Sequence, residues 1–381
     1  FTAHRAGSVY SPRSVVIVNP PTPERVRELR DAGGAARALQ WVLEGMITGS
    51  ARELGRTRSA FLRQLLDQGI EKGAAEQLTT QAVELGQVSD DHVELKLTEE
   101  QREEAEAQAV KIALATFDSR VRIDDLLKAI PTGSSLHSLY EERYRDTMSQ
   151  AGLDGIELVD RFPVLSGNFG YTRGQAVPGA SRLVAFQDRR NQNQYVVFAQ
   201  TEALFIRLNP RRVAAWLQQN GHHLDSWTDD RSAREAILRA AIIPLPGSDP
   251  PQQPTAGSSL LTLVHSFAHR FVRRAAVHAG LDRNSLSEFL VPLHLGFFVF
   301  AAARGGFVLG GLQALFESAL DQLIEEIVYS EHRCALDPAC DRSGAACAAC
   351  LHLGEPSCRW FNRYLNRSSL HGLNGYFNVS T

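Results

Sequence analysis

The chain has 381 residues, of which 44% are hydrophobic and 22% are charged, and its formal net charge is −3. This length gives room for two or three domains with cores of their own. A chain that is nearly neutral overall does not bind nucleic acid through its total charge. The sequence has no run of 18 apolar residues, so no transmembrane helix is expected. It starts at Phe1 rather than at Met, which is compatible with a piece of a longer protein.

The first third of the chain is expected to be mainly helical. A β-branched run at 15–18, bounded by prolines, predicts one strand. Thr22 and Pro23 then have the positions of an N-cap and a first helical residue. The segment 99–117 is the clearest helix, because it is acidic at its start and apolar along one face. We therefore predict a mainly helical N-terminal region over 1–133.

The pattern changes after residue 133, where short apolar segments alternate with Gly, Asn and Pro. It predicts a charged helix, several strands and a further helix, in the order 137–150, 156–174, 195–199, 203–208 and after Pro210. This succession predicts a central α+β domain over 134–243.

Residues 244–259 contain five prolines among polar residues, which is typical of a linker. The sequence then predicts a helix at 260–279, a short helix from Ser285, a strand at 295–303, a glycine-rich turn and a helix at 310–330. The expected fold class is α+β and multidomain. It has a helical N-terminal region, a mixed α/β central segment and an α/β C-terminal domain over 260–381 with a four-cysteine zinc site.

All cysteines of the chain lie within residues 334–358, at Cys334, Cys340, Cys347, Cys350 and Cys358. Zn²⁺ binds four thiolates tetrahedrally at about 2.3 Å, and a C-x-x-C turn presents two sulfurs to one ion. Five cysteines compete for four positions. The favoured set is Cys340, Cys347, Cys350 and Cys358, with Cys334 as the alternative to Cys340. A closed site of this kind would be structural rather than catalytic.

Other uses of these cysteines explain less of the pattern. Disulfides are disfavoured by the odd number and by the lack of any cysteine elsewhere in the chain. A redox pair would need only Cys347 and Cys350. An iron–sulfur cluster also uses four cysteines and stays an alternative. We expect structural zinc in a cytoplasmic protein.

Two further motifs carry weaker signals. His265 and His269 stand four residues apart on one helix face, which is metal-ligand spacing, but Ser266 excludes the HExxH motif. We expect packing or interface histidines, with a second metal site as the alternative. The glycines of AARGGFVLGGLQAL predict a tight turn, with phosphate binding as the alternative. No lysine follows a glycine anywhere, so the chain has no P-loop.

Several sequence phrases occur in the same order as in a known family. They are HSFAHR, LDRNSLSEFL, GFFVFAAARGGFVLGGLQAL and CALDPACDRSGAACAACLHLGEPSCRWFNRYLNR. They resemble the helicase-associated four-cysteine domain of MrfA-type helicases, and more closely the DrmB family of DISARM anti-phage systems. SVYSPRSVVIVNPP, FPVLSGNFGYTRG and TEALFIRLNPRRVAAWL are similar to upstream segments of that family. The resemblance is strong over 256–381, patchy over 1–20 and 136–217, and unsupported over about 22–130.

The resemblance implies a non-catalytic, accessory subunit of an antiviral, restriction-like defence complex. Its partner would be a DrmA-like, ATP-dependent helicase, and foreign DNA would be recognised or handled through the complex. The resemblance implies zinc on the same five cysteines and gives no catalytic residue to carry over. No membrane partner is expected.

Only four of the 40 basic residues are lysines, which a GC-rich genome or a role in phosphate contact would explain. The arginines in 161–212 are candidate phosphate contacts: Arg161, Arg173, Arg182, Arg189, Arg190, Arg207, Arg211 and Arg212. The favoured nucleic-acid-binding set is Arg173, Arg189, Arg190, Arg211 and Arg212. Two alternative functions stay open. One is a stand-alone, metal-dependent DNA-processing enzyme with an open site near His265 and His269, and the other is a scaffold that does not bind DNA.

Overall fold

The structure is a computed structural model of the chain. It describes residues 10–46, 58–84, 88, 95–117, 119–174, 181–188, 191–281, 285–302, 310–330, 332–354 and 357–379. Within these residues it combines helices with one large antiparallel sheet, which confirms the predicted α+β class. No helix in this part of the chain is long and apolar enough to cross a membrane.

The sheet has five strands along its main path, and every pair is antiparallel. Their order is β1 (Tyr10–Val18), β3 (Leu153–Gly174), β7 (Tyr195–Leu208), β9 (Gly296–Ala301) and β8 (Leu286–Val291). Two further strands, β2 (Val121–Arg122) and β4 (Ser181–Ala185), also pair with β3. The short strands β5 (Gln187–Asp188) and β6 (Asn191–Gln192) pair only with each other.

The long strand β3 is the main departure from the predicted pattern. The sequence predicts several short strands here, but β3 runs without interruption for 22 residues and pairs with β7 along most of its length. Pro163 lies inside it opposite Gln200, and the register shifts between Val159 and Phe162. This register shift marks a β-bulge, in which the extra residues of β3 have no partner on β7. The bulge lets β3 continue as one strand through this region. Similarly, the two strands predicted at 195–199 and 203–208 form the single strand β7.

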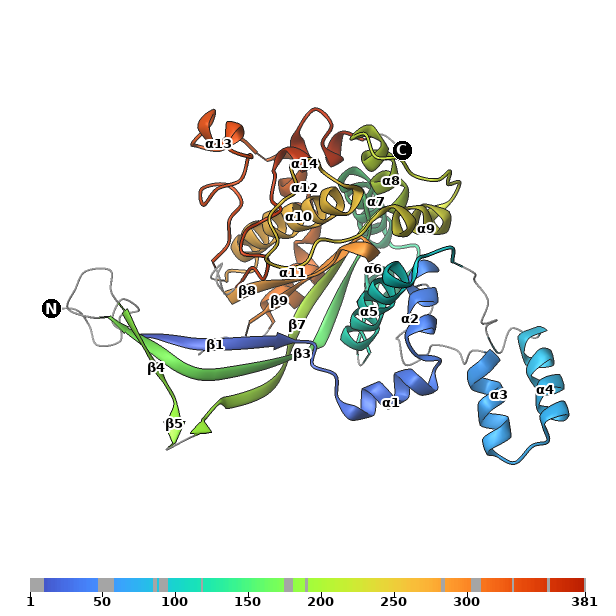
Figure 1. The fold of residues 1–381 in the computed structure, drawn as a ribbon. Helices are drawn as coiled ribbons and strands as arrows, with labels where there is room; N and C mark the ends of the chain where they lie inside the picture. Colours follow the sequence, from blue (N-terminus) through green and yellow to red (C-terminus); the bar gives the residue numbers. More distant parts are fainter. Residues whose placement is uncertain are drawn as a thin grey trace.

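The helices of the N-terminal and central segments lie mostly at one end of the sheet, with α3 and α4 apart from it (Figure 1). They are α1 (Pro23–Asp31), α2 (Gly34–Leu43), α3 (Arg58–Asp67), α4 (Lys72–Glu84), α5 (Glu99–Ala115), α6 (Ile123–Lys128), α7 (Ser135–Ala151), α8 (Pro210–Gln219) and α9 (Asp230–Ala240). The predicted starts of α1 and α5 are confirmed. Thr22 caps α1, and Thr98 forms a capping box with Gln101 at the start of α5.

The C-terminal segment contributes the remaining helices. They are α10 (Ala256–His278), α11 (Gly311–Ser318), α12 (Leu320–Tyr329), α13 (Ala339–Arg342), α14 (Ser368–His371) and the 3₁₀ turns η3 (Pro292–His294) and η4 (Tyr376–Asn378). The helix predicted from Ser285 is wrong, because 286–291 is strand β8 and pairs with β9 along its whole length. The helix predicted at 310–330 is two helices divided at Ala319, whose φ of −140° is not helical. Part of the glycine-rich turn, residues 303–309, lies outside the described residues.

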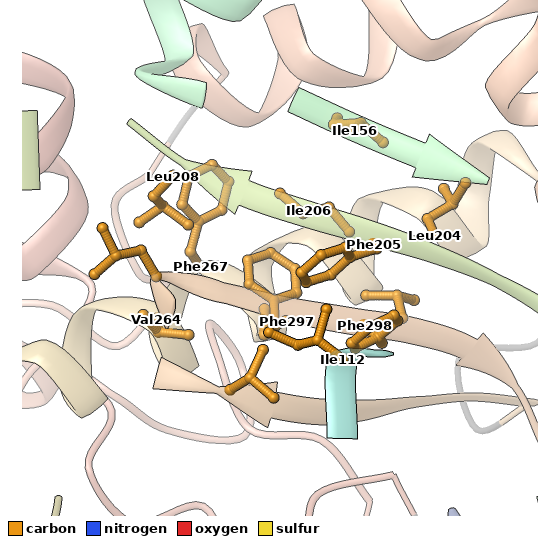
Figure 2. Packing of buried hydrophobic residues seen from close by; sticks show 14 of the residues in the cluster. Ile112, Ile156, Leu204, Phe205, Ile206, Leu208, Val264, Phe267, Phe297 and Phe298 are labelled. Carbon is orange, nitrogen blue, oxygen red and sulfur yellow. The ribbon is translucent and has the colours of Figure 1, made fainter. Parts of the chain in front are cut away.

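Aromatic residues on β9 connect the sheet to the helices on its two faces. Phe297 packs against Phe267 of α10, with ring centroids 5.7 Å apart. The next residue, Phe298, points to the other face. It stacks on Phe205 of β7, with centroids 4.2 Å apart, and shares the core with Ile112 of α5 (Figure 2). Because 153–208 and 286–301 share this sheet, the predicted linker at 244–259 separates chain segments with a common core. The four-part division into domains stays a prediction.

The outer end of the β3–β7 ladder leaves apolar side chains exposed. Figure 1 shows β1, β4 and β5 extending away from the helices. Tyr195, Val196, Val197 and Phe198 at the start of β7 are between 48% and 64% exposed. Since neighbouring strand residues point to opposite faces, residues 195–198 expose apolar side chains on both faces of the sheet. We call this segment the apolar arm.

Candidate metal centre

Four cysteine side chains meet in the segment that follows α12. They are Cys334, Cys340, Cys347 and Cys350, and all four sulfurs lie within 4.8 Å of one another. Three Sγ–Sγ distances are 3.5 Å (Cys334 to Cys347), 3.7 Å (Cys347 to Cys350) and 3.8 Å (Cys340 to Cys350). Four thiolates around one tetrahedral ion with bonds of about 2.3 Å would lie about 3.8 Å apart. The sulfur positions therefore fit a single four-coordinate ion.

Short turns bring these cysteines together. The backbone N–H of Cys347 donates to Cys350 Sγ over 3.2 Å, and the N–H of Leu336 donates to Cys334 Sγ over 3.4 Å. Between Cys340 and Cys347 the chain reverses through Gly344, with φ +102°, and Ala345, with φ +55°. Left-handed backbone favours glycine at such a reversal. The sequence thus shapes the loop so that backbone amides face the sulfurs.

The surroundings act differently on the four thiols. Burial opposes ionisation of Cys347, but hydrogen bonds from the backbone N–H groups of Cys350 and Ala349 and from the side chains of Cys334 and Cys340 outweigh it and lower the pKa of Cys347 to about 7. Burial raises the pKa of Cys340 and of Cys350. The buried guanidinium of Arg367 lies 3.9 Å from Cys340 Sγ and donates to Asp337 over 2.5 Å. Asp337 in turn accepts from the Cys334 N–H over 2.8 Å. Arg367 thus connects Cys340 to Asp337, and Asp337 connects it to the backbone of Cys334.

The structure differs from the favoured ligand set at one position. Cys334 lies with Cys340, Cys347 and Cys350, so it accompanies Cys340 rather than replacing it. Cys358 lies elsewhere, with its sulfur 3.3 Å from His265 Nε2. The spacing of the cysteines could not predict that Cys358 lies apart from the other cysteines, because its neighbours His265 and His269 belong to α10, far away in the chain. Arg367 and Asp337 were also missed, and no sequence pattern marks them.

The predicted arginine contacts that the structure describes do not form one patch. Arg189 and Arg190 lie outside the described residues. Arg173 is exposed near the outer end of β3, whereas Arg211 follows the opposite end of the β3–β7 ladder. At about 3.3 Å per residue, these two positions are on the order of 60 Å apart along the strand. Arg211 also pairs with Asp230 over 2.7 Å.

Arg212 does not have the exposure that a phosphate contact requires. It is 7% exposed, and its guanidinium donates to the main-chain carbonyls of Ser149, Gln150, Tyr376 and Phe377 over 2.7–3.1 Å. Its donors are therefore used inside the protein, and we remove Arg212 from the candidate DNA contacts.

Comparison with known proteins gives one informative likeness. No family model matches the chain. The chain is similar to the DISARM protein DrmB of Bacillus paralicheniformis, with 29% identity over 182 residues. The matched part is 44% of this chain and 31% of that protein, so the chain spans about a third of the relative's length. The likeness agrees with the resemblance of the sequence phrases.

Proposed function

We propose that this chain is a DrmB-like, non-catalytic accessory subunit of an anti-phage defence complex. It binds a DrmA-like helicase partner and assists the handling of foreign DNA. The observation that carries the proposal is the likeness to the DISARM protein DrmB. The four-cysteine cluster supports it, because four thiolates would leave a bound zinc ion no open position for substrate. Zinc in this cluster would hold the C-terminal segment in shape.

The partner is needed for any ATP-driven step, since the sequence has no P-loop. The apolar arm at 195–198 is the surface where contact with the helicase is best tested. Exposed contiguous apolar side chains are typical of protein–protein contact sites. Val197 on this arm is 64% exposed, and Val277 at the end of α10 is 73% exposed but lies outside the arm. The two valines therefore form a matched pair for testing.

The experiment measures binding and DNA-stimulated ATP hydrolysis of the helicase with and without this chain. We expect hydrolysis to depend on the chain, Val197→Asp to weaken binding at least tenfold, and Val277→Asp to have little effect. Failure of the wild-type chain to bind or affect the helicase would overturn the accessory function. Equal effects of the two variants would remove only the arm from the interface.

The DNA contact rests on exposed arginines and is tested separately. Charge reversal at Arg173 and at Arg211 should each lower the DNA affinity of the complex. Each true phosphate contact should also reduce the slope of log affinity against log salt by about 1. Unchanged affinity and slope in both variants would favour a scaffold that does not bind DNA.

The DNA-processing alternative has less support from the structure. His265 and His269, around which its metal site was expected, are both 0% exposed. A scissile phosphate has no access to such a position. Metal-dependent DNA cleavage by the chain alone, abolished by His269→Gln, would nevertheless favour this alternative.

A further inference from the structure

A second cluster of metal-binding side chains lies apart from the four cysteines. His265 and His269 come from α10, Glu288 from β8 and Cys358 from the C-terminal segment. These four side chains are buried, with residues between 0% and 2% exposed. One ligand atom of each lies within 4.8 Å of the other three. Three chain segments far apart in the sequence thus supply one buried group of imidazole, carboxylate and thiolate ligands.

Three of the distances between these side chains are close to those between ligands of one ion. His265 Nε2 lies 3.1 Å from Glu288 Oε1, and His269 Nε2 lies 3.3 Å from Glu288 Oε2. His265 Nε2 lies 3.3 Å from Cys358 Sγ. Nitrogen and oxygen ligands of one tetrahedral zinc ion would lie about 3.4 Å apart, and nitrogen and sulfur ligands about 3.6 Å apart.

The hydrogen bonds of His269 leave a lone pair directed at the carboxylate. His269 Nδ1 lies 2.9 Å from the carbonyl oxygen of Leu351, so Nδ1 carries the proton and donates it. Its Nε2 then has a lone pair and faces Glu288. Among the residues that the structure describes, none is a hydrogen-bond partner of His269 Nε2 or of either oxygen of Glu288. Three buried acceptor atoms facing one another are costly unless a cation lies between them. A histidine that donates Nδ1–H to a carbonyl and offers Nε2 to a metal is a common arrangement in metal sites.

Cys358 and the backbone around it are also fixed. Its sulfur accepts from the backbone N–H of Asn362 over 3.3 Å. The neighbouring carbonyl of Ser357 accepts from the backbone N–H of Glu288 over 3.2 Å. The ligands therefore project from a helix, a strand and a segment hydrogen-bonded to that strand. Such supports hold a site in place before the ion binds.

The charges of the cluster match a divalent ion. Two neutral imidazoles, one carboxylate and one thiolate carry two negative charges, which a divalent cation cancels. A neutral centre is much less costly to bury than one with net charge. The mixed nitrogen, oxygen and sulfur ligands suit zinc.

We propose that His265, His269, Glu288 and Cys358 bind a second, structural zinc ion that fastens the C-terminal segment to α10 and β8. The ligand set is complete and buried, so this ion has no position open to substrate. The site is separate from the four-cysteine cluster and does not depend on the proposed accessory function. The two sites share the segment 334–358 and fix its two ends.

The test measures metal content and metal environment in the full chain. Elemental analysis of the wild-type protein should give two zinc ions per chain. X-ray absorption should show an average of about 2.5 sulfur ligands per ion, from one four-sulfur site and one single-sulfur site. One ion per chain with only sulfur ligands would overturn the proposal, and this measurement does not require any variant to fold.

Matched variants assign the ions to their sites. Cys358→Ser and His269→Gln should each lose one ion and leave an ion with four sulfur ligands. Cys340→Ser should lose the four-sulfur ion and keep the ion with mixed ligands. Two ions retained with an unchanged sulfur average in Cys358→Ser would also overturn the proposal. Circular dichroism of each variant separates loss of one site from loss of the fold.

Discussion

Glu157 should be one of the most important polar residues for stability, and Glu157→Gln tests this. Its side chain is 2% exposed and accepts from Arg120 Nε over 2.5 Å and Nη2 over 2.8 Å. It also accepts from Arg207 Nη2 over 3.0 Å. The amide removes the negative charge between the two guanidinium groups, so that Arg207 keeps only its ion pair with Asp154 and the compensation of Arg120 is weakened most. Removing one partner of a buried ion pair costs about 3–5 kcal/mol, and we expect a loss of this size.

Urea unfolding at pH 7 measures this difference, with Glu24→Gln as the control. Glu24 pairs with Arg27 over 3.3 Å, but both side chains are 67% exposed, so its loss should cost less than about 1 kcal/mol. Burial alone would raise the pKa of Glu157, but Arg207 and Arg120 outweigh burial and lower it. The contribution of Glu157 is therefore present above about pH 4.3 and is lost as pH falls through the lowered folded-state pKa. A Glu157→Gln cost no larger than that of Glu24→Gln at pH 7 would refute the reasoning.

Two further substitutions have matched controls in the chain. Arg212→Met removes the guanidinium donors of four carbonyls, of which those of Ser149 and Tyr376 keep a backbone N–H, and should cost about 1–3 kcal/mol. Arg211→Met on the exposed side should cost less than about 1 kcal/mol. Equal urea midpoints for these two variants would contradict the buried carbonyl contacts. Gly257→Ala would place its Cβ 1.8 Å from the carbonyl oxygen of Ile242, so thermal unfolding should show a loss of about 1–3 kcal/mol or more. Gly73→Ala meets nothing closer than 4.0 Å and should stabilise by about 0.5–1 kcal/mol, and a loss there would indicate a different backbone.

Local signals in the sequence predicted helix starts well. Thr22 with Pro23 at the start of α1, and the acidic residues at the start of α5, act within one helical turn, so their effect is visible in the sequence. The strand at 286–291 was predicted as helix because its type depends on pairing with β9 and on burial. Tertiary contacts of this kind override local propensity.

Among the cysteines too, contacts between residues close in sequence could be predicted, and contacts between distant residues could not. Cys347 and Cys350 form a local turn, and their pairing was visible in the sequence. The assignment of Cys358 was not visible, because its neighbours His265 and Glu288 lie far away in the chain. The spacing of His265 and His269 indicated half of the second site. Nothing in the sequence marks Glu288 as its carboxylate, since only the pairing of β8 with β9 places β8 beside α10.

The position of η4 affects the order in which the protein can complete its core during synthesis. Tyr376 is fully buried, and its hydroxyl donates to the carbonyl of Gly152 over 2.5 Å. A ribosome adds about 5–20 residues per second, so Gly152 waits roughly 10–45 s for Tyr376 to be made. Strands β3 and β7 are made early in this interval, whereas β9 and both metal-binding segments are made later in it. The nascent chain must therefore keep its apolar strands from aggregating until nearly all of these residues have left the ribosome.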